Sequence, residues 1–299
     1  MKRYILKLYY LILDIRDKFI ILNNIRVDKF NKKPKIEDTD ETINFLLENN
    51  CSMSRYGDGE FSLISGESLK FQPYNKELAT KLKNILISDD KNIIIGIPYA
   101  INNVDSYTCK AQKYWGKYLN LNRNKIYKLL DMEKQYFDTQ VTRLYMDTAD
   151  KLKVGDRFNK LKKIWDRKTI VIVEGEKSRL GVGNDLFSNA NSISRIICPS
   201  IDAYNKYNDI LKEIKKQNKE SLILIALGPT ATVLSYELSK LGYRALDIGH
   251  IDIEYEWFLN NSKQKEPVKN KYIGEINGGD IVEDTNNLKY KKEIIKYII

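Results

Sequence analysis

Cysteine and histidine, which supply the ligands of most protein zinc sites, are scarce in this chain. Its 299 residues contain three cysteines, Cys51, Cys109 and Cys198, and one histidine, His250. The cysteines are far apart and form no CxxC pair, so the sequence predicts neither a zinc site nor a disulfide framework. Free thiols are typical of a reducing compartment, and we therefore expect a cytoplasmic protein.

Long uninterrupted apolar runs are also missing. The N-terminal stretch MKRYILKLYYLILDIRDKFIIL is strongly apolar, but charged residues such as Lys7 and Asp14 interrupt it. It falls short of the roughly 20 apolar residues that a membrane-spanning helix requires, and no small-residue cleavage site of a secretory signal follows it. Its apolar positions recur at helical spacing, which predicts an amphipathic helix within residues 1–28. Such a helix either packs on the protein body, which is the commoner case, or lies on the inner face of a membrane as a peripheral contact.

Acidic residues are fewer than basic ones. The chain has 50 Lys and Arg residues against 40 Asp and Glu residues, a net charge of +10. This excess favours an anionic partner, which could be nucleic acid, a membrane surface or a phosphorylated small molecule. The lysines are scattered along the chain and are not clustered with stacking aromatic residues, so we do not expect nucleic acid as the partner.

Strand-like and helix-like segments alternate along the chain. The runs CSMSRY, KNIIIGIP, TIVIVE, RIICP and LILIAL predict strands, as do residues 245–248, and helical patterns cover residues 41–49, 203–216 and 231–241. The aromatic-rich middle, residues 106–163, is mainly helical by pattern. This alternation predicts an α/β protein with a Rossmann-like, mainly parallel sheet flanked by helices.

The predicted organisation has three parts. Residues 1–35 form the amphipathic N-terminal helix and a linker, residues 36–275 the α/β domain, and residues 276–299 a C-terminal tail helix. Just before the tail, the stretch EINGGDIVED is predicted as a turn between short strands.

Two carboxylates, Asp58 and Glu60, stand one residue apart in the glycine-containing stretch SRYGDGEFSLISG. Carboxylate oxygens suit Mg²⁺ or Mn²⁺, and two adjacent like charges would repel each other without a cation. Gly57 and Gly59 would let the backbone fold tightly around the ion, with Arg55 just before it. The alternative is a solvated turn, since the D-x-E pattern often arises by chance.

Three further loops follow predicted strands at the edge of the sheet where parallel α/β proteins bind anions. The first is predicted to lead into a helix, and its candidates for binding a diphosphate are Glu174, Gly175, Ser178, Arg179, Gly181, Gly183 and Asp185. The second is a possible phosphate cradle made of Gly228, Pro229 and Thr230, although Thr230 could simply cap the helix. The third contains His250, Asp252 and Glu254.

Five strings of the sequence occur in the order found in one known family. They are RYGDGEF, VTRLYMD, EGEKSRLGVGNDLF, ALGPTATVL and DIGHIDIEYEWF. Over about residues 40–275 the chain resembles the GT-D type glycosyltransferases, a bacterial family long catalogued as a domain of unknown function. The resemblance implies a UDP-sugar donor and a divalent cation held by a D-x-E motif, here Asp58 and Glu60. It also implies a glycan, glycoprotein or lipid-linked acceptor in the biosynthesis of surface polysaccharides or glycoproteins.

The chemistry of glycosyl transfer agrees with these residues. Negative charge builds on the departing diphosphate, which a metal ion, Arg179 and Arg143 would stabilise. The acceptor hydroxyl needs a base or an orienting carboxylate. Asp252 and Glu254 are candidates, and His250 is either the base or a contact to metal and phosphate. The sequence does not rank these three.

Two other functions are compatible with a basic α/β chain. One is a nucleotide-dependent oxidoreductase, but no G-x-G-x-x-G follows a predicted strand and no acidic residue stands at the distance that holds a ribose. The other is a non-catalytic binder of membranes or nucleic acid that depends on the charge of +10.

Overall fold

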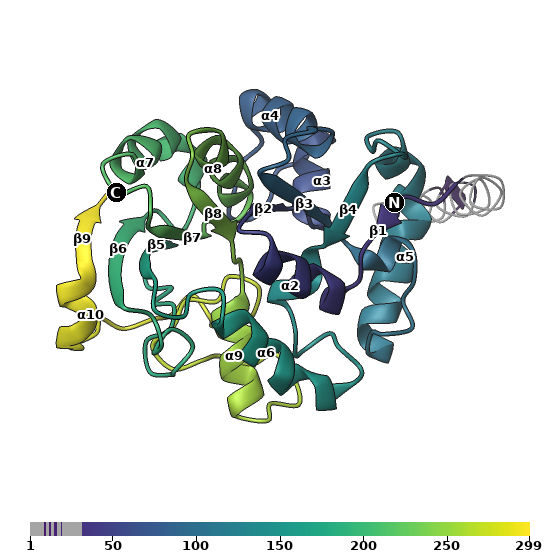
Figure 1. Cartoon of the computed structure of the whole chain (residues 1–299). Helices are drawn as coiled ribbons and strands as arrows, with labels where there is room; N and C mark the ends of the chain where they lie inside the picture. The colour runs from purple at the N-terminus through teal and green to yellow at the C-terminus, as the bar shows by residue number, and fades with distance from the viewer. Residues whose placement is uncertain (1–8, 10–11, 13–14, 17–18, 20–31) are drawn as a thin grey trace.

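The protein is built on one sheet of nine parallel strands. The computed structural model describes residues 32–299 together with Tyr9, Ile12, Ile15, Arg16 and Phe19. The strand order is β1-β4-β3-β2-β8-β7-β5-β6-β9 (Figure 1), and neighbouring strands are parallel throughout. The strands are β1 (Lys35–Ile36), β2 (Ser52–Arg55), β3 (Ile93–Ile97), β4 (Gln135–Asp138), β5 (Thr169–Gly175), β6 (Ser192–Cys198), β7 (Leu222–Ala226), β8 (Arg244–Asp247) and β9 (Ile294–Tyr297). The predicted α/β class with a mainly parallel sheet is confirmed.

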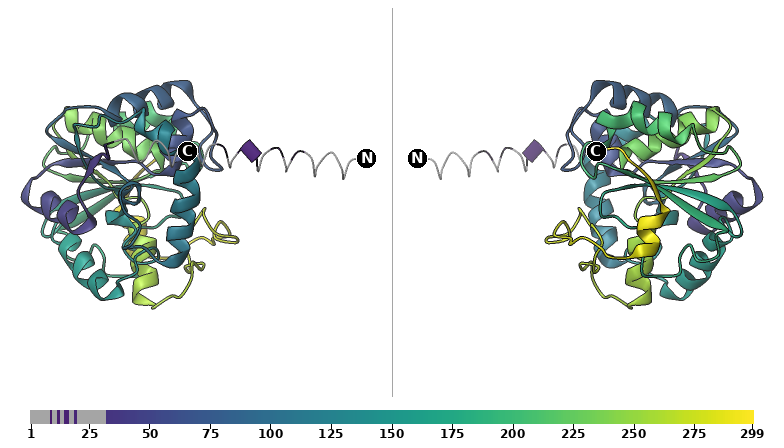
Figure 2. Two further views of the ribbon diagram at one scale, coloured as in Figure 1. Left: turned by 90° about the vertical axis from the view of Figure 1, so that its right-hand side faces the viewer. Right: turned by 90° about the vertical axis from the view of Figure 1, so that its left-hand side faces the viewer.

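Helices cover both faces of the sheet. In Figures 1 and 2, α4, α7 and α8 lie on one face, and α2, α6 and α9 lie on the other. The helices are α2 (Thr39–Glu48), α3 (Asp58–Ile64), α4 (Lys76–Leu86), α5 (Cys109–Tyr127), α6 (Val154–Lys162), α7 (Tyr207–Ile214), α8 (Pro229–Lys240), α9 (Ile251–Leu259) and α10 (Leu288–Glu293). A parallel sheet needs this cover, because its crossover connections place helices against both faces.

The central strands are apolar on both sides. In β3, Ile93, Ile95 and Ile97 belong to the hydrophobic cluster under α4 and α8, whereas Ile94 belongs to the cluster under α2 and α6. Successive side chains of a strand point to opposite faces, so one continuous apolar run contributes to two cores. This explains why KNIIIGIP reads as an unbroken run without alternation.

The predicted helix after β5 is wrong. Residues 176–191 form a series of turns between β5 and β6. Lys177, Arg179, Gly181 and Gly183 have positive φ angles of 64°, 51°, 72° and 89°. Right-handed helices exclude such angles, so this connection has no helix N-terminus to present to an anion.

The C-terminal tail differs from the helix predicted over residues 276–299. It is helical only in α10, and residues 294–297 then form β9, which pairs with β6 at the edge of the sheet. The β-branched Ile294 and Ile295 favour a strand wherever a neighbouring edge is open. In the middle region, β4 is a strand within a segment predicted as mainly helical.

The predicted amphipathic N-terminal helix lies mostly outside the described residues. Tyr9, Ile12, Ile15 and Phe19 are helical and between 47% and 72% exposed. Among the described parts of the chain, no helix combines the length and the apolar character that crossing a bilayer requires.

Candidate active site

A cavity of about 1120 Å³ opens at the carboxyl ends of the strands. Residues at or just after the ends of β4, β2, β8, β7 and β5 line it, so it extends across much of the sheet. The adjacent strands β2 and β8 lie at its centre, between the strands of the first and the second half of the chain. Open α/β sheets bind their ligands where the strand order reverses in this way.

An ion pair joins β2 and β8 at the floor of this cavity. Arg55 Nη2 lies 2.7 Å from Asp247 Oδ1, and Arg55 Nε donates to the backbone oxygen of Asp247 at 2.8 Å. Gly249 makes room for the guanidinium, since a Cβ there would lie 2.0 Å from Arg55 Nη2. Arg55, predicted to contact the donor, lines the cavity but is held in place by Asp247.

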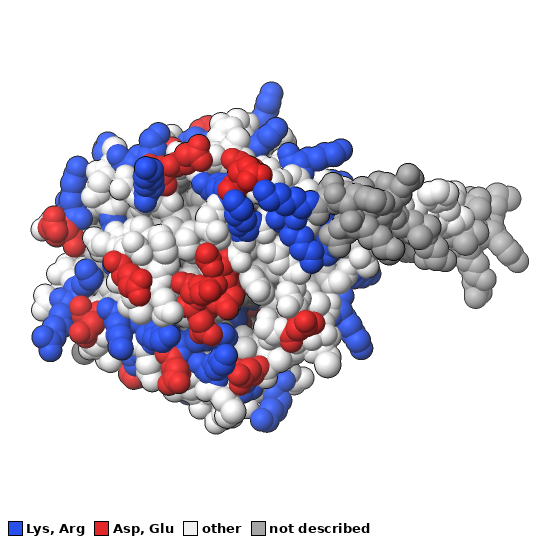
Figure 3. Space-filling view, turned by 45° about the vertical axis from the view of Figure 1, so that its right-hand side comes forward, with Lys and Arg blue, Asp and Glu red and all other residues white. Residues whose placement is uncertain are grey.

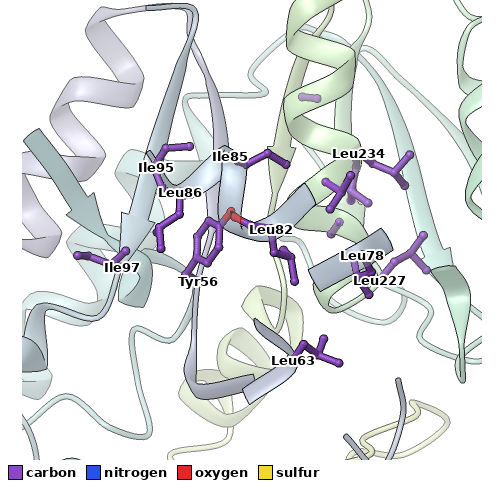
Figure 4. Close-up of a cluster of buried hydrophobic side chains, with 14 of the residues drawn as sticks. Tyr56, Leu63, Leu78, Leu82, Ile85, Leu86, Ile95, Ile97, Leu227 and Leu234 are labelled. Atoms are coloured by element: carbon purple, nitrogen blue, oxygen red, sulfur yellow. The ribbon is translucent and has the colours of Figure 1, made fainter. Parts of the chain in front are cut away.

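The acidic turn forms the first turn of α3. Asp58 begins this helix, and Glu60 accepts a hydrogen bond from the backbone N–H of Gly57 at 2.6 Å. Tyr56, just before the turn, is fully buried among the apolar side chains in Figure 4, and its hydroxyl donates to the backbone oxygen of Leu82 at 2.7 Å. The two carboxylates therefore stand on a rigid support at the cavity wall.

These two carboxylates fit a hard divalent cation. Both line the cavity, and burial raises the pKa of Glu60 to about 7. Among the described residues, no group of three or more His, Cys, Asp and Glu side chains is placed to hold a metal ion. Water and substrate oxygens would have to complete the shell around Asp58 and Glu60. Mg²⁺ is commonly bound in this way, through one or two carboxylates plus phosphate oxygens.

The hydroxyl of Tyr114, on α5, donates to Asp58 Oδ2. Burial, followed by the Asp58 carboxylate, raises the pKa of Tyr114, so the hydroxyl stays protonated and keeps donating. A donor of this kind fixes the orientation of a metal-binding carboxylate while its other oxygen remains available. Tyr114 thus acts as a positioning residue for Asp58.

If Asp58 holds the predicted cation, Tyr114→Phe should raise the Mn²⁺ concentration needed for half-saturation of the protein by about tenfold, because Asp58 loses its orienting donor. The measurement is a Mn²⁺ binding titration of the protein. Tyr118→Phe is the control, since it removes a hydroxyl from the neighbouring ring. An unchanged Mn²⁺ requirement in Tyr114→Phe would contradict this role.

Glu275 gathers three cationic or basic side chains at the cavity. Its carboxylate lies 3.4 Å from Arg143 Nη1, 3.6 Å from His250 Nε2 and 3.1 Å from Lys265 Nζ. Burial alone would raise the pKa of Glu275, but Arg143, then His250 and Lys265, hold it down at about 2. Glu275 is therefore a permanent anion that stands beside the single histidine of the chain.

His250 is a neutral imidazole in these surroundings. Partial enclosure by the cavity wall and then the charge of Arg143 lower its pKa below the usual 6.5, although the side chain is 38% exposed and Glu275 opposes the shift. We expect the imidazole NMR signals of the tag-free protein to titrate with a midpoint below about pH 6. Arg143→Gln should raise the pKa of His250, and Glu275→Gln should lower it further. An inflection between pH 6 and 7 in the unmodified protein would refute this prediction.

Asp252 lies at the cavity wall but is occupied by structural partners. Lys271 Nζ is 2.6 Å from Asp252 Oδ2, while the backbone N–H of Gly181 and the amide of Asn184 donate to Oδ1. Only 1% of Asp252 is exposed. A carboxylate bound in this way has little freedom to accept a proton, so its contacts do not support the predicted role as a base.

Glu254 does not line the cavity. It is fully buried, and its Oε2 accepts the backbone N–H groups of Tyr145 at 2.9 Å and Met146 at 2.8 Å. These bonds hold the segment after β4 against α9. Because Glu254 does not line the cavity, its contacts support a structural role and do not support the predicted catalytic one.

Several residues of the first loop that were predicted to contact phosphate form ion pairs or hydrogen bonds with other residues of the protein instead. Glu174 is buried in an ion pair with Arg195, and the guanidinium of Arg179 donates to the backbone oxygens of Asn270 and Glu283. Asp185 pairs with Lys162 at 2.6 Å. Their backbone turns replace the expected helix, so these side chains are directed away from the cavity.

Backbone groups of the loops remain at the cavity. Gly175, Ser178 and Gly228 line it, whereas Pro229 and Thr230 are buried in the first turn of α8. Gly181 and Gly183 do not line it. The structure therefore brings the following predicted site residues together: Arg55, Gly57, Asp58, Glu60, Arg143, Gly175, Ser178, Gly228, His250 and Asp252.

Tyr114, Gln140, Asp247 and Glu275 are among the residues of the cavity wall that the sequence analysis missed. Asp247 lies near the end of a predicted strand, which is a usable signal, because side chains at strand ends meet at the sheet edge. Gln140 follows β4, a strand without an apolar run, and Glu275 comes from the irregular segment after α9. Neither carries a local pattern that marks it as functional.

Acidic and basic side chains are intermixed on the face in Figure 3. Asp and Glu side chains gather towards the middle, and Lys and Arg side chains are distributed around them. The positive charge therefore forms no continuous basic patch among the described residues of this face. Nucleic-acid binding normally depends on such a patch.

Comparison with known proteins gives consistent results. The family described as glycosyltransferase with GT-D fold matches residues 53–276. A glycosyltransferase of Streptococcus pneumoniae, GlyD, is 38% identical over 266 residues, which cover 89% of this chain and 33% of that protein. A probable glycosyl transferase of Streptococcus gordonii, Gly, is 38% identical over 257 residues, covering 86% of this chain and 38% of that protein. The chain thus spans little more than a third of the length of these curated relatives.

The solved structures that match this chain are covered over their whole length, unlike the curated relatives. A structure described as a new glycosyltransferase from Streptococcus sanguinis superposes with a TM-score of 0.85 at 36% identity, covering 89% of this chain and 100% of that chain. A second, described as domain of unknown function 1792 with a distinct glycosyltransferase fold, has a TM-score of 0.85 at 35% identity and covers 95% of this chain and 100% of that chain. The fold of this chain is therefore shared with these proteins over most of its length.

Proposed function

Because this chain belongs to the family of glycosyltransferases with the GT-D fold, we propose that it transfers a hexose from a UDP-sugar to a glycan, glycoprotein or lipid-linked acceptor with the help of Mn²⁺ or Mg²⁺. The observation that carries this proposal is the pair Asp58 and Glu60, which stands on a rigid helix start in the middle of the cavity. A divalent ion held there can bridge to a diphosphate and neutralise its charge.

The donor nucleotide is assigned to the half of the cavity under β7 and β5. Gly228 precedes the first turn of α8, and Gly175 and Ser178 follow β5, so backbone groups can approach phosphate oxygens closely there. Charge on the leaving diphosphate increases towards the transition state. The metal ion and Arg143 would therefore stabilise the transition state more than the bound substrate.

His250 is our candidate for the group that orients the acceptor hydroxyl. Its imidazole is neutral and can accept a hydrogen bond from that hydroxyl, and the Glu275 carboxylate lies 3.6 Å from its Nε2. Its lowered pKa makes it too weak a base to remove the proton by itself. This arrangement takes over the role that the sequence assigned to Asp252 and Glu254.

We further propose that the enzyme acts in the cytoplasm at the inner face of the membrane, with residues 1–28 as a peripheral contact. The exposed apolar side chains of Ile12, Ile15 and Phe19 support this. Deleting residues 1–28 should release the protein from anionic vesicles in a sedimentation assay. Equal sedimentation with and without these residues would exclude the contact.

A donor screen tests the proposed reaction. UDP, GDP, TDP and CMP sugars are incubated with the protein, with and without Mn²⁺, and release of the free nucleotide is measured. We expect release from at least one UDP-hexose, and loss of that release when EDTA removes the metal. Nucleotide release that does not depend on metal would refute metal dependence, and binding of NAD without binding of UDP would favour the oxidoreductase alternative.

A further inference from the structure

The acidic pair divides the cavity into two halves. The sheet order across the cavity is β4-β3-β2-β8-β7-β5, and Asp58 and Glu60 follow the central strand β2. The half under β7 and β5 contains Gly228 and Gly175, and the opposite half is bounded by α5 and by the segment after β4. If the sugar is transferred at the metal and the nucleotide occupies the first half, the acceptor has to approach from the second.

An aromatic side chain forms the wall of this second half. Tyr114 lines the cavity and is 50% exposed. Its ring lies parallel to that of Tyr118, with an interplanar angle of 7°, and edge-on to that of Trp115, with centroids 5.5 Å apart. Its hydroxyl is held by Asp58. A ring fixed at so many points provides apolar contact area without losing further side-chain freedom when a ligand binds.

A polar group without a partner lies in the same half. Gln140 lines the cavity, is only 7% exposed, and its Oε1 is buried without a hydrogen-bond partner. Both backbone hydrogen-bonding groups of Gln140 have partners: its N–H donates to Asp138, and its carbonyl accepts from the N–H of Arg143. A buried acceptor left unpaired costs about 1–3 kcal/mol, so such groups are normally satisfied by water or by a ligand.

The chemistry of the two side chains matches a sugar. One face of a pyranose ring carries C–H groups that pack on an aromatic ring, and each hydroxyl is both a donor and an acceptor, as is the amide of Gln140. Rotation about the last side-chain dihedral of a glutamine is soft, so either end of the amide can turn to the cavity. Charges of both signs line the cavity, among them Lys110, Lys151 and Asp147, so the lining does not select for a charged ligand of one sign.

We propose that Tyr114 and Gln140 form the acceptor subsite and bind a neutral saccharide unit. The ring of Tyr114 packs against the sugar, and the amide of Gln140 hydrogen-bonds to one of its hydroxyl groups. This assignment rests on the proposed glycosyl transfer. It places the acceptor beside Asp58, where the hydroxyl that attacks the donor sugar must lie.

The first test separates the ring of Tyr114 from its hydroxyl. Tyr114→Phe and Tyr114→Ala both lose the hydrogen bond to Asp58, so the difference between them reports the ring alone. The probes are methyl β-glycosides of glucose, galactose and N-acetylglucosamine, added to the donor that the screen identifies, at saturating Mn²⁺. We expect the acceptor KM to be at least about tenfold higher in Tyr114→Ala than in Tyr114→Phe, with donor KM values equal within about threefold. Equal acceptor KM values, or an equal shift in donor KM, would overturn the subsite.

The second test addresses Gln140. Gln140→Met keeps the length of the side chain and removes its hydrogen-bonding groups, and Gln135→Met at the exposed start of β4 is the matched control. We expect Gln140→Met to raise the acceptor KM about tenfold. A monodeoxy glycoside that lacks the hydroxyl bound by Gln140 should be a poor acceptor for the unmodified protein, and its acceptor KM should be no higher in Gln140→Met. If the effects of the substitution and of the missing hydroxyl on KM were fully additive in free energy, contact between Gln140 and that hydroxyl would be refuted.

Saccharide binding can also be followed without turnover. Saturation-transfer NMR of the methyl glycosides is recorded with the full chain, UDP and Mn²⁺. We expect a signal that Tyr114→Ala abolishes. Absence of binding in the unmodified protein, or retained binding in Tyr114→Ala, would overturn the subsite. Binding without any nucleotide release would instead overturn the proposed reaction alone.

Discussion

Replacing Asp58 by Asn or Glu60 by Gln is expected to lower the rate of sugar transfer by about 10³-fold, which corresponds to roughly 4 kcal/mol of transition-state stabilisation. Each substitution removes one anionic ligand of the proposed cation and keeps the shape of the side chain. The amide oxygen of Gln at position 60 can still accept the hydrogen bond of Gly57, so the start of α3 should remain intact. The rate is measured as nucleotide release with Mn²⁺ and an identified donor.

Glu67→Gln is the control for these variants. Glu67 is an exposed carboxylate just beyond α3, and its loss removes the same charge without touching the cavity. Thermal unfolding of all three variants should match that of the unmodified protein. Full activity in both Asp58→Asn and Glu60→Gln would eliminate the metal role of the acidic turn and with it the proposed mechanism.

Arg195→Met is expected to destabilise the protein by about 3–5 kcal/mol, the usual cost of leaving a buried charge without its partner. Arg195 is 2% exposed and forms ion pairs at 2.7 Å with both Glu174 and Glu293. Its guanidinium also lies over the ring of Tyr290 at 5.1 Å. The substitution leaves two carboxylates facing an apolar side chain, and the free energy of unfolding in urea at pH 7 measures the loss.

The pH dependence of this loss follows from the same charges. Burial already raises the pKa of Glu174, and Arg195 is the strongest influence that lowers it. Without Arg195 the pKa of Glu174 rises further, so between about pH 7 and 5 the folded variant takes up more protons than the folded unmodified protein does, and the deficit should shrink as the pH falls. Arg167→Met at an exposed ion pair is the control, with an expected change below about 1 kcal/mol. A loss of stability below about 1 kcal/mol in Arg195→Met as well would show that the buried cluster is not important for stability.

This cluster connects the tail to the body of the protein. Glu293 ends α10, and Glu174 lies in β5, where its second oxygen accepts the N–H of Leu180 at 2.7 Å. The C-terminal strand β9 is thereby held against β6 by charge as well as by sheet pairing. None of these partners could be paired from the sequence, because more than 90 residues separate Arg195 from Glu293.

Most of the sheet was predictable because its strands are continuous apolar runs. KNIIIGIP and LILIAL have to be buried on both faces, which only a parallel sheet covered by helices allows. Three strands had no such signal. β1 has only two residues, at the end of the predicted linker, and β4 is the mixed segment QYFD. β9 becomes a strand because the edge of β6 is open beside it. After β5 a turn leading into a helix was predicted, and only the turn is present, because positive φ angles such as those of Gly181 and Gly183 continue the irregular backbone towards β6.

The acidic turn could be found in the sequence because its chemistry is local. Only Gly59 separates Asp58 from Glu60, and both line the cavity because the Glu60 carboxylate folds back to the backbone N–H of Gly57 at the start of the helix. The fold class is determined in a similar way, by runs of neighbouring residues. Tyr114, Gln140 and Glu275 had no such mark, since they lie on a helix, after an unrecognised strand and in a late loop.

Only packing decided which charged side chains face the cavity and which are used inside the protein. Asp252 and Glu254 come soon after His250 in the same segment, yet Lys271 binds Asp252 and the backbone of residues 145–146 binds Glu254. A carboxylate serves catalysis or structure according to the partners that reach it, and those partners come from distant parts of the chain. The sequence by itself therefore determines the helices, the strands and the acidic turn. Which of the other charged side chains face the cavity, and which bind other parts of the protein, is decided only when the sheet has formed.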